Sequence, residues 1–543
     1  MSIGYMSPVN AVRVVSNAAA FSVRAAALLA RSIEKRCGAK TVSEGWELTI
    51  ELALDAILGS ESYLIESAEP RAIRVVGGDG LGLTFGVGKL LHTSRYDQTG
   101  FSASAWRGYS SPQAGFRAIY VATHFMNFYE AAPWDDVRCY IDELTLWGAN
   151  TVIVTFPIWS FFGWHDPAGQ ANLRRLVGVL GAAKQAGIKI GVLVEQNQGF
   201  SSAPPSIRAA KVPDEEGRRG DLGVNCCPSH PEGRAYLLRI HAELFSCLGD
   251  LTLDYLILWP YDEGGCGCED CRPWGSRGFL SISRAMVDLA RQTHPEIKAI
   301  LSTWCFDTPT AGEWAGLARR LKQEPGWLDC IMADSHEEFP RYPLKVGVPG
   351  GLPLVSFPEI SMWGRSWGGS GANPLPKRFE RLWRQIAGTV DGGMPYSEGI
   401  YEDINKVICL QFYWDRQRSA TDTLREYLAC EFSPDHVDVL LKVIDLFEEN
   451  WLDAGSGSLE ALELVRQVNR SLSLRARTAW RWRIVYLRAL IDAEHYSQGG
   501  LLSRTVLKAA YDELTEIYHA DHADFRVKPP GSLASIEISR SCK

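Results

Sequence analysis

The chain has 543 residues, which is too long for a single hydrophobic core, so several domains are expected. With 46% hydrophobic and 22% charged residues and a mean hydropathy of -0.10, the composition is that of a globular protein and excludes an integral membrane protein or a disordered chain. The net charge of -8 argues against a nucleic-acid partner, because phosphate binding needs a clustered Lys/Arg surface.

The first apolar stretch, residues 18–30, is predicted to be an amphipathic helix. Arg24 interrupts it, Arg31 follows it, and no small-residue cleavage site comes after. No apolar run approaches the roughly 20 residues needed to cross a bilayer. We therefore expect a cytoplasmic protein with no membrane partner, whose 13 cysteines are mostly reduced.

Residues 1–112 are predicted to form an N-terminal α+β domain. Strand patterns alternate there with helical patterns, the first of which runs through Lys35. The expected strands are Val12–Val15, Trp46–Ala53 and a hairpin of Ser62–Glu66 with Ala72–Val76.

A glycine-rich run, Gly77 to Gly82, follows this hairpin. It could be read as a dinucleotide-binding fingerprint, but the glycine spacing differs and no returning strand with an acidic end follows. We favour a tight turn that leads from a strand into a helix ending near His92.

Residues 113–405 are predicted to form a (β/α)8 TIM-type barrel, which places the chain in the α/β class. Short apolar runs there alternate with helical patterns, as parallel strands and their connecting helices do. Eight strands are expected: Phe116–Ala122, Thr151–Phe156, Lys189–Val194, Tyr255–Trp259, Ala299–Thr303, Cys330–Ala333, Pro353–Phe357 and about Gly392–Tyr396.

Residues 406–543 are predicted to form a helical C-terminal domain, because strand patterns stop and long amphipathic segments follow. These segments are Ile408–Phe432, His436–Trp451, Leu459–Tyr496 and Arg504–His519. They are also candidate surfaces for a homodimer.

Reactive groups in such a barrel lie at the carboxyl ends of the strands. Aromatic rings, carboxylates and amides follow these strands, and such a set suits a sugar, whose C–H faces stack on rings and whose hydroxyls need directional hydrogen bonds. The candidate substrate-binding residues are His124, Asn127, Trp159, Glu195, Asn197, Tyr261, Trp304, Asp334, Trp363, Arg365, Tyr396 and Glu398.

Two adjacent carboxylates, Asp262 and Glu263, come directly after the fourth strand. Glycosidic cleavage needs a carboxylic acid that protonates the leaving oxygen and a second carboxylate, and we favour Glu263 as the acid because of its longer reach. The second carboxylate is Asp262, Glu359 or Glu398, and the sequence leaves all three open. The alternative interpretation of the pair is a solvated acidic turn.

Three cysteines follow the acidic pair: Cys266, Cys268 and Cys271. This spacing is typical of a metal-binding knuckle, and a fourth ligand would close a tetrahedral zinc site. We favour Cys227 as this ligand, with Cys226 and His230 as substitutes. Such a zinc ion would be structural, with no cofactor required for the chemistry. Free thiols or a disulfide are the alternatives.

In layout the chain resembles the β-N-acetylhexosaminidases and α-glucuronidases. The shared features are an N-terminal domain closing with "IRVVGGDGLGLTFGVGKLL", a barrel with "DE" after its fourth strand, and a helical C-terminal domain. "CCPSHPEGRAYLL" followed by "WPYDEGGCGCEDC" is similar to bacterial barrel hydrolases of the same superfamily.

The hexosaminidase resemblance implies that Glu263 is the acid and that Asp262 orients the substrate's acetamido group, which attacks the anomeric carbon. The α-glucuronidase resemblance implies that an acid at this strand works with carboxylates of later strands, here Asp334 and Glu359, that activate water. The cysteine knuckle departs from both patterns.

We therefore expect an exo-acting glycoside hydrolase that cleaves a hexosaminide- or uronide-like sugar from short oligosaccharides. The competing interpretations are a non-catalytic sugar-binding protein on a barrel scaffold, and a zinc hydrolase of amides or esters. No HExxH pattern supports the last of these.

Overall fold

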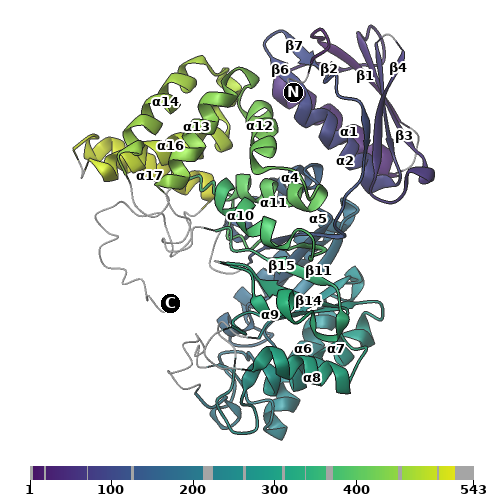
Figure 1. Cartoon of the computed structure of the whole chain (residues 1–543), viewed down its shortest axis with the longest axis vertical. Helices are drawn as coiled ribbons and strands as arrows, with labels where there is room; N and C mark the ends of the chain where they lie inside the picture. Colours follow the sequence, from purple (N-terminus) through teal and green to yellow (C-terminus); the bar gives the residue numbers. More distant parts are fainter. Residues whose placement is uncertain are drawn as a thin grey trace.

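A sheet with two helices, a closed barrel and a group of helices follow one another along the chain (Figure 1). The computed structural model describes residues 4–16, 20–69, 71–123, 128–211, 224–260, 265–307, 312–336, 338–361, 371–450, 455–497 and 500–519. Within these ranges, no helix combines the length and the apolar character needed to cross a bilayer.

The N-terminal sheet has the strand order β2-β1-β3-β5-β4-β8. Strands β1, β2, β3 and β5 run parallel, whereas β4 runs antiparallel to both β5 and β8. The predicted hairpin is therefore confirmed as β4 and β5. The elements are β1 Ala11–Ser16, α1 Ala20–Cys37, β2 Lys40–Thr41, β3 Leu48–Leu54, β4 Tyr63–Glu69, β5 Ala72–Gly77, α2 Gly80–Thr93, β6 Arg95–Asp97, β7 Gly100–Ser102 and β8 Gly108–Ser110.

The glycine-rich run forms the predicted tight turn between β5 and α2. The Asp79 side chain caps the helix by accepting a hydrogen bond of 2.7 Å from the backbone N–H of Gly82. A Cβ atom on Gly78 would lie 1.7 Å from the carbonyl oxygen of Gly59, so only glycine fits this close backbone approach.

The barrel closes in the strand order β10-β11-β12-β13-β14-β15-β16-β9, with every neighbouring pair parallel. All eight predicted strands are confirmed within the described residues. They are β9 Phe116–Val121, β10 Thr151–Thr155, β11 Lys189–Val194, β12 Tyr255–Leu258, β13 Lys298–Ser302, β14 Cys330–Asp334, β15 Leu354–Phe357 and β16 Gly392–Gly393.

Helices connect the barrel strands on the outside. They are α3 Phe128–Ala131, α4 Trp134–Leu146, α5 Pro167–Gln185, α6 Pro231–Cys247, α7 Gly278–Thr293, α8 Glu313–Gln323, α9 Arg341–Lys345, α10 Pro376–Ile386 and α11 Asp403–Trp414. Helix α11 follows β16 and contacts β9, so it completes the ring and spans the predicted domain boundary at residue 405.

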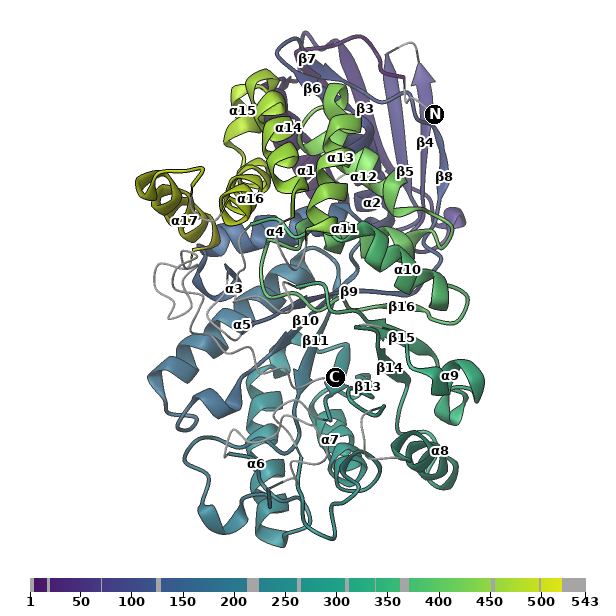
Figure 2. The ribbon, with the colours of Figure 1, turned by 60° about the vertical axis from the view of Figure 1, so that its left-hand side comes forward.

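The C-terminal helices lie beside the helices of the N-terminal domain, where α12 contacts α2 and β6, and both groups stand on the same side of the barrel (Figures 1 and 2). Two of the predicted amphipathic segments contain more than one helix, because Ser419 and Ser473 each cap a new helix start. The helices are α12 Ala420–Glu431, α13 Val437–Glu449, α14 Gly457–Ser471, α15 Leu474–Thr478, α16 Trp480–Tyr496 and α17 Arg504–Tyr518.

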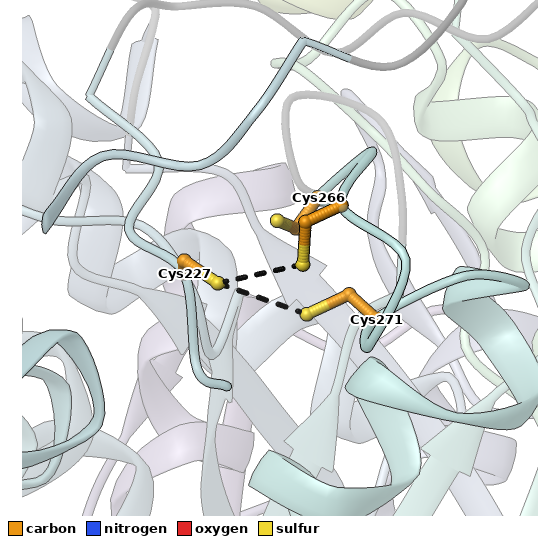
Figure 3. A group of neighbouring side chains, drawn as sticks. Cys227, Cys266 and Cys271 are labelled. Carbon is orange, nitrogen blue, oxygen red and sulfur yellow. Dashed lines mark hydrogen bonds between the residues drawn. The ribbon is translucent and has the colours of Figure 1, made fainter. Parts of the chain in front are cut away.

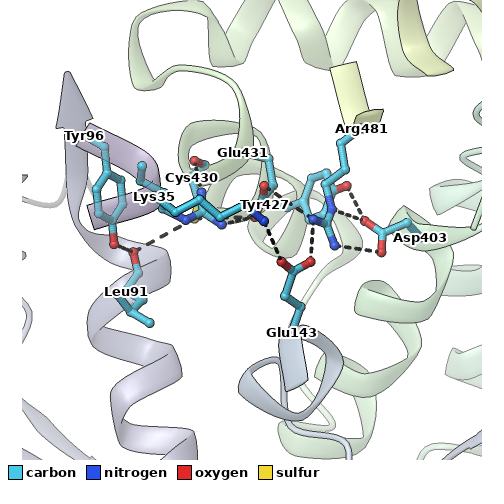
Figure 4. Close-up of polar contacts among 10 residues, drawn as sticks. Lys35, Leu91, Tyr96, Glu143, Asp403, Tyr427, Cys430, Glu431 and Arg481 are labelled. Atoms are coloured by element: carbon cyan, nitrogen blue, oxygen red, sulfur yellow. Dashed lines mark hydrogen bonds and ion pairs between the residues drawn. The ribbon is translucent and has the colours of Figure 1, made fainter. Parts of the chain in front are cut away.

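A buried ion-pair network centred on Arg481 ties these parts together (Figure 4). Arg481, on α16, donates to Asp403 of α11 over 2.7 Å and to Glu143 of α4 over 2.8 Å. On α12, Glu431 lies 3.9 Å from Arg481 and 2.6 Å from Arg36 of α1. Burial opposes the ionisation of Glu431, yet the two arginines lower its pKa to about 2. The network thus joins the N-terminal helix, the barrel and the C-terminal helices.

Replacing Arg481 with Met is expected to lower the free energy of unfolding by about 3–5 kcal/mol, because Asp403 and Glu431 lose a buried charge partner. Denaturant unfolding measures this change. Arg483→Met is the matched control, since Arg483 is on the same helix but pairs with Glu513 in a partly exposed position. Equal losses in the two variants would contradict a special role for the network.

Candidate active site

Aromatic side chains gather inside the barrel where the strands end. Trp259, just after β12, stacks on Trp304, after β13, with ring centroids 5.6 Å apart. It also meets Phe357 of β15 edge-on at 4.8 Å. Tyr396, after β16, lies 5.8 Å from Phe357 and stacks on Tyr120 of β9 at 5.4 Å. Inward-facing residues of five strands therefore form one aromatic lining at the carboxyl end of the barrel.

A histidine between two carboxylates borders this lining. His336 Nδ1 lies 2.6 Å from an Asp334 oxygen, and its Nε2 lies 3.6 Å from Glu359 Oε2. Its ring lies 4.3 Å from that of Trp304, centroid to centroid. Burial disfavours the charged imidazole, but the two carboxylates outweigh burial and raise the pKa of His336 to about 9. The two carboxylates therefore favour the protonated imidazole at neutral pH.

Glu359 is held in a single orientation. Its side chain is buried, with 8% of the residue exposed. Oε1 accepts hydrogen bonds from the Ser361 backbone N–H, at 2.8 Å, and from the Ser361 hydroxyl. Oε2 faces His336. Such an oriented carboxylate is pre-positioned, as a nucleophile, a base or a substrate-orienting group requires.

Glu398 lies on the neighbouring strand end. Its Oε1 accepts a hydrogen bond of 2.7 Å from the Tyr396 hydroxyl, and Tyr396 in turn packs on Phe357. The structure thus brings Trp304, Asp334, Glu359, Tyr396 and Glu398 into one connected group, to which it adds His336, Trp259 and Phe357.

Three other candidates lie after β10 and β11. Trp159 and Glu195 are half-buried, and Glu195 accepts a hydrogen bond from the Gln198 amide. Asn197 has only 1% of its surface exposed. Its Nδ2 donates a hydrogen bond of 2.7 Å to the Gly265 carbonyl, and its Oδ1 accepts one of 3.0 Å from the Gly265 backbone N–H. This geometry favours a positioning role for Asn197 over direct contact with a ligand.

Seven candidates lie outside the described residues, and two of them are the proposed acid pair. They are His124, Asn127, Tyr261, Asp262, Glu263, Trp363 and Arg365. Of the nearest described residues, Pro260 directly follows Trp259 at the carboxyl end of the barrel, and Gly265 is hydrogen-bonded to Asn197, which follows β11.

Four cysteine sulfurs lie together beside this end of the barrel. Cys227, Cys266, Cys268 and Cys271 have their Sγ atoms all within 4.8 Å of one another, and Figure 3 shows Cys227 facing Cys266 and Cys271. Such a group can hold a metal ion. Of the two substitutes considered from the sequence, Cys226 points its sulfur to the Val224 carbonyl instead, and the His230 side chain caps α6.

Comparison with known proteins relates the fold to carbohydrate-active enzymes. No protein-family profile matches the sequence, and no curated protein sequence matches it significantly. Among solved structures, the chain is similar to a family GH115 4-O-methyl-α-glucuronidase with specificity for decorated arabinogalactans (TM-score 0.60, 12% identity, 95% of this chain and 76% of that one).

Two further structures cover most of the chain. A GH138 enzyme targeting pectin rhamnogalacturonan II has a TM-score of 0.57 at 11% identity, over 93% of this chain and 72% of that one. A GH20 exo-β-N-acetylglucosaminidase from Vibrio harveyi has a TM-score of 0.54 at 12% identity, over 82% and 76%. At these identities the comparisons establish a shared fold: the chain has the N-terminal domain and barrel architecture of these glycoside hydrolases.

Proposed function

We propose that the chain is an exo-acting glycoside hydrolase that removes a terminal hexosaminide- or uronide-like sugar from short oligosaccharides. The observation that carries this proposal is the lining of aromatic rings next to the fixed Asp334–His336–Glu359 group at the carboxyl end of the barrel. Rings offer stacking faces for a sugar, and the carboxylates offer acceptors for its hydroxyls. The similarity of the fold to glucuronidases and hexosaminidases supports the same substrate class.

In this proposal Glu263 is the general acid that protonates the glycosidic oxygen, with Asp262 beside it. Of the three candidates for the second carboxylate, we favour Glu359, because its two oxygens are oriented by Ser361 and His336. Ser361 and His336 hold Glu359 in one orientation, as a nucleophile or base requires. His336 is thus a positioning residue that acts through Glu359.

A non-catalytic sugar-binding protein is the second candidate, since the same lining suits binding alone. A panel of aryl glycosides, including N-acetylhexosaminides and glucuronides, separates the two. Turnover of at least one glycoside by the wild-type protein, measured by release of the aryl alcohol, supports the hydrolase. Calorimetric binding of a monosaccharide with no turnover of any glycoside would support the binding protein.

For the four-cysteine group we propose a zinc ion with a structural role, so that no cofactor takes part in the chemistry. We further propose that the protein works in the cytoplasm, where a thiolate cluster of this kind stays reduced. Cell fractionation tests the location, and sedimentation tests whether the C-terminal helices form a homodimer.

A further inference from the structure

The four sulfurs have the spacing of a tetrathiolate metal site. Cys227 Sγ lies 3.7 Å from Cys268 Sγ and 3.9 Å from Cys271 Sγ. In a regular tetrahedron with zinc–sulfur bonds of about 2.3 Å, sulfur atoms are about 3.8 Å apart. A disulfide needs a separation of about 2.05 Å. These separations therefore fit thiolates around one metal ion, and all four sulfurs lie within 4.8 Å of one another.

The ligands come from two different loops of the barrel. Cys227 belongs to the loop between β11 and α6, whereas Cys266, Cys268 and Cys271 belong to the loop between β12 and α7. The loops also meet elsewhere: the Gly267 N–H donates to the Ala210 carbonyl over 2.8 Å, and Ser229 Oγ lies 3.1 Å from Cys271 Sγ. A metal ion at this position would cross-link the two loops.

The same two loops flank the residues proposed as the acid pair. On one side, Trp259 N–H donates to the Val194 carbonyl over 3.0 Å, and the Trp274 indole donates to the Pro260 carbonyl. On the other side, the Asn197 amide holds both backbone groups of Gly265, next to Cys266 of the four-cysteine group. The chain is thus fixed immediately before and immediately after residues 261–264.

We infer that a zinc ion bound by Cys227, Cys266, Cys268 and Cys271 acts with the Asn197 amide as a clamp, which controls activity by fixing the loop that carries Glu263. This inference rests on the proposed function of Glu263. The four thiolates complete a tetrahedral shell and leave no open position for water or substrate. The ion therefore acts on the reaction through the loop and does not contact the substrate.

The test compares Cys268→Ser with Cys247→Ser, an exposed cysteine on α6 outside the group. Metal analysis of the wild-type protein is expected to find one zinc ion per chain, retained in Cys247→Ser and lost in Cys268→Ser. Hydrogen exchange is expected to rise in peptides covering residues 195–211, 224–230 and 265–277, with the barrel strands still protected. Less than one equivalent of metal in the wild-type protein, or exchange that rises throughout the barrel, would overturn the clamp.

Activity gives the second readout. Misplacing a catalytic group by about 1 Å costs roughly 100-fold in rate, so kcat of Cys268→Ser is expected to fall at least tenfold. Asn197→Ala is expected to keep the zinc ion and still lose kcat. Replacing zinc with cobalt or cadmium is expected to leave kcat within about twofold. An unchanged kcat in both variants, or a kcat that follows the identity of the metal, would overturn the inference.

The failure of the clamp and the failure of the proposed function give different results. If the wild-type protein turns over no glycoside, the hydrolase proposal fails, whereas metal content and hydrogen exchange still report on the cross-link. If the wild-type protein is active and metal-free, only the clamp fails.

Discussion

Glu263→Gln is expected to lower kcat by about 10³-fold on oligosaccharides, because glutamine cannot protonate the leaving glycosidic oxygen. The loss should depend on the leaving group. An aryl alcohol of low pKa departs without protonation, so turnover of an activated aryl glycoside should fall far less than turnover of an alkyl glycoside. Initial rates on a series of glycosides with increasing leaving-group pKa measure this slope.

Glu269→Gln is the matched control, since Glu269 is exposed on the same loop and outside the proposed chemistry. It should leave all rates within about twofold of the wild-type values, because surface substitutions of this kind have small effects. A loss in Glu263→Gln that is the same for every leaving group would contradict its role as the acid. Unchanged rates would move the acid to another carboxylate at the barrel mouth.

The barrel was predictable from the sequence because its strands are buried on both faces and appear as short apolar runs. Runs such as Lys189–Val194 therefore coincide with the observed strand β11. The last strand was harder to predict. β16 is only Gly392–Gly393, and it is defined by its bridges to Ser356 and to Phe116, which no local pattern encodes.

The position of the candidate site in the barrel was predictable from the sequence, whereas the contacts between its side chains were less so. Strand ends identify Asp334 and Glu359, but the pairing of both with His336 depends on the register of β14 against β15. His336 lies in the same strand-end segment as Asp334. The only sequence feature that could have indicated their pairing was an acidic residue two positions before a histidine. The buried amide of Asn197 shows the opposite case, because its partner Gly265 is 68 residues away.

The cysteine site lay between these extremes. Three of its four cysteines, Cys266, Cys268 and Cys271, were recognisable from their spacing, because they lie within six residues of one another. The fourth cysteine comes from another loop, and the sequence alone does not separate Cys227 from Cys226 or His230. Packing in the folded protein distinguishes these candidates. The Cys226 sulfur faces the Val224 carbonyl, whereas the Cys227 sulfur faces the other three sulfurs.

Glu359→Gln is expected to lower kcat/KM by about 10²–10⁴-fold and to lower the pKa of His336. In the wild-type protein this pKa is about 9, because Asp334 and Glu359 outweigh burial. Because the pKa of His336 in the folded protein is raised above 6.5, the attraction between the imidazolium and its carboxylates contributes its full stabilisation below about pH 6.5. This stabilisation is lost as the pH rises through about 9. Activity that requires charged His336 should therefore decline above pH 9 in the wild-type protein and at lower pH in the variant.

NMR titration of the His336 ring and pH–rate profiles measure the two effects on the same samples. Asp334→Asn should also lower the pKa of His336 while keeping Glu359, so it should shift the alkaline limb with a smaller loss of maximal rate. Glu338→Gln, at an exposed position nearby, should change neither. If Glu359→Gln lowered the pKa of His336 and left kcat/KM intact, Glu359 would be a partner of the histidine alone. The second carboxylate would then be sought at Asp262 or Glu398.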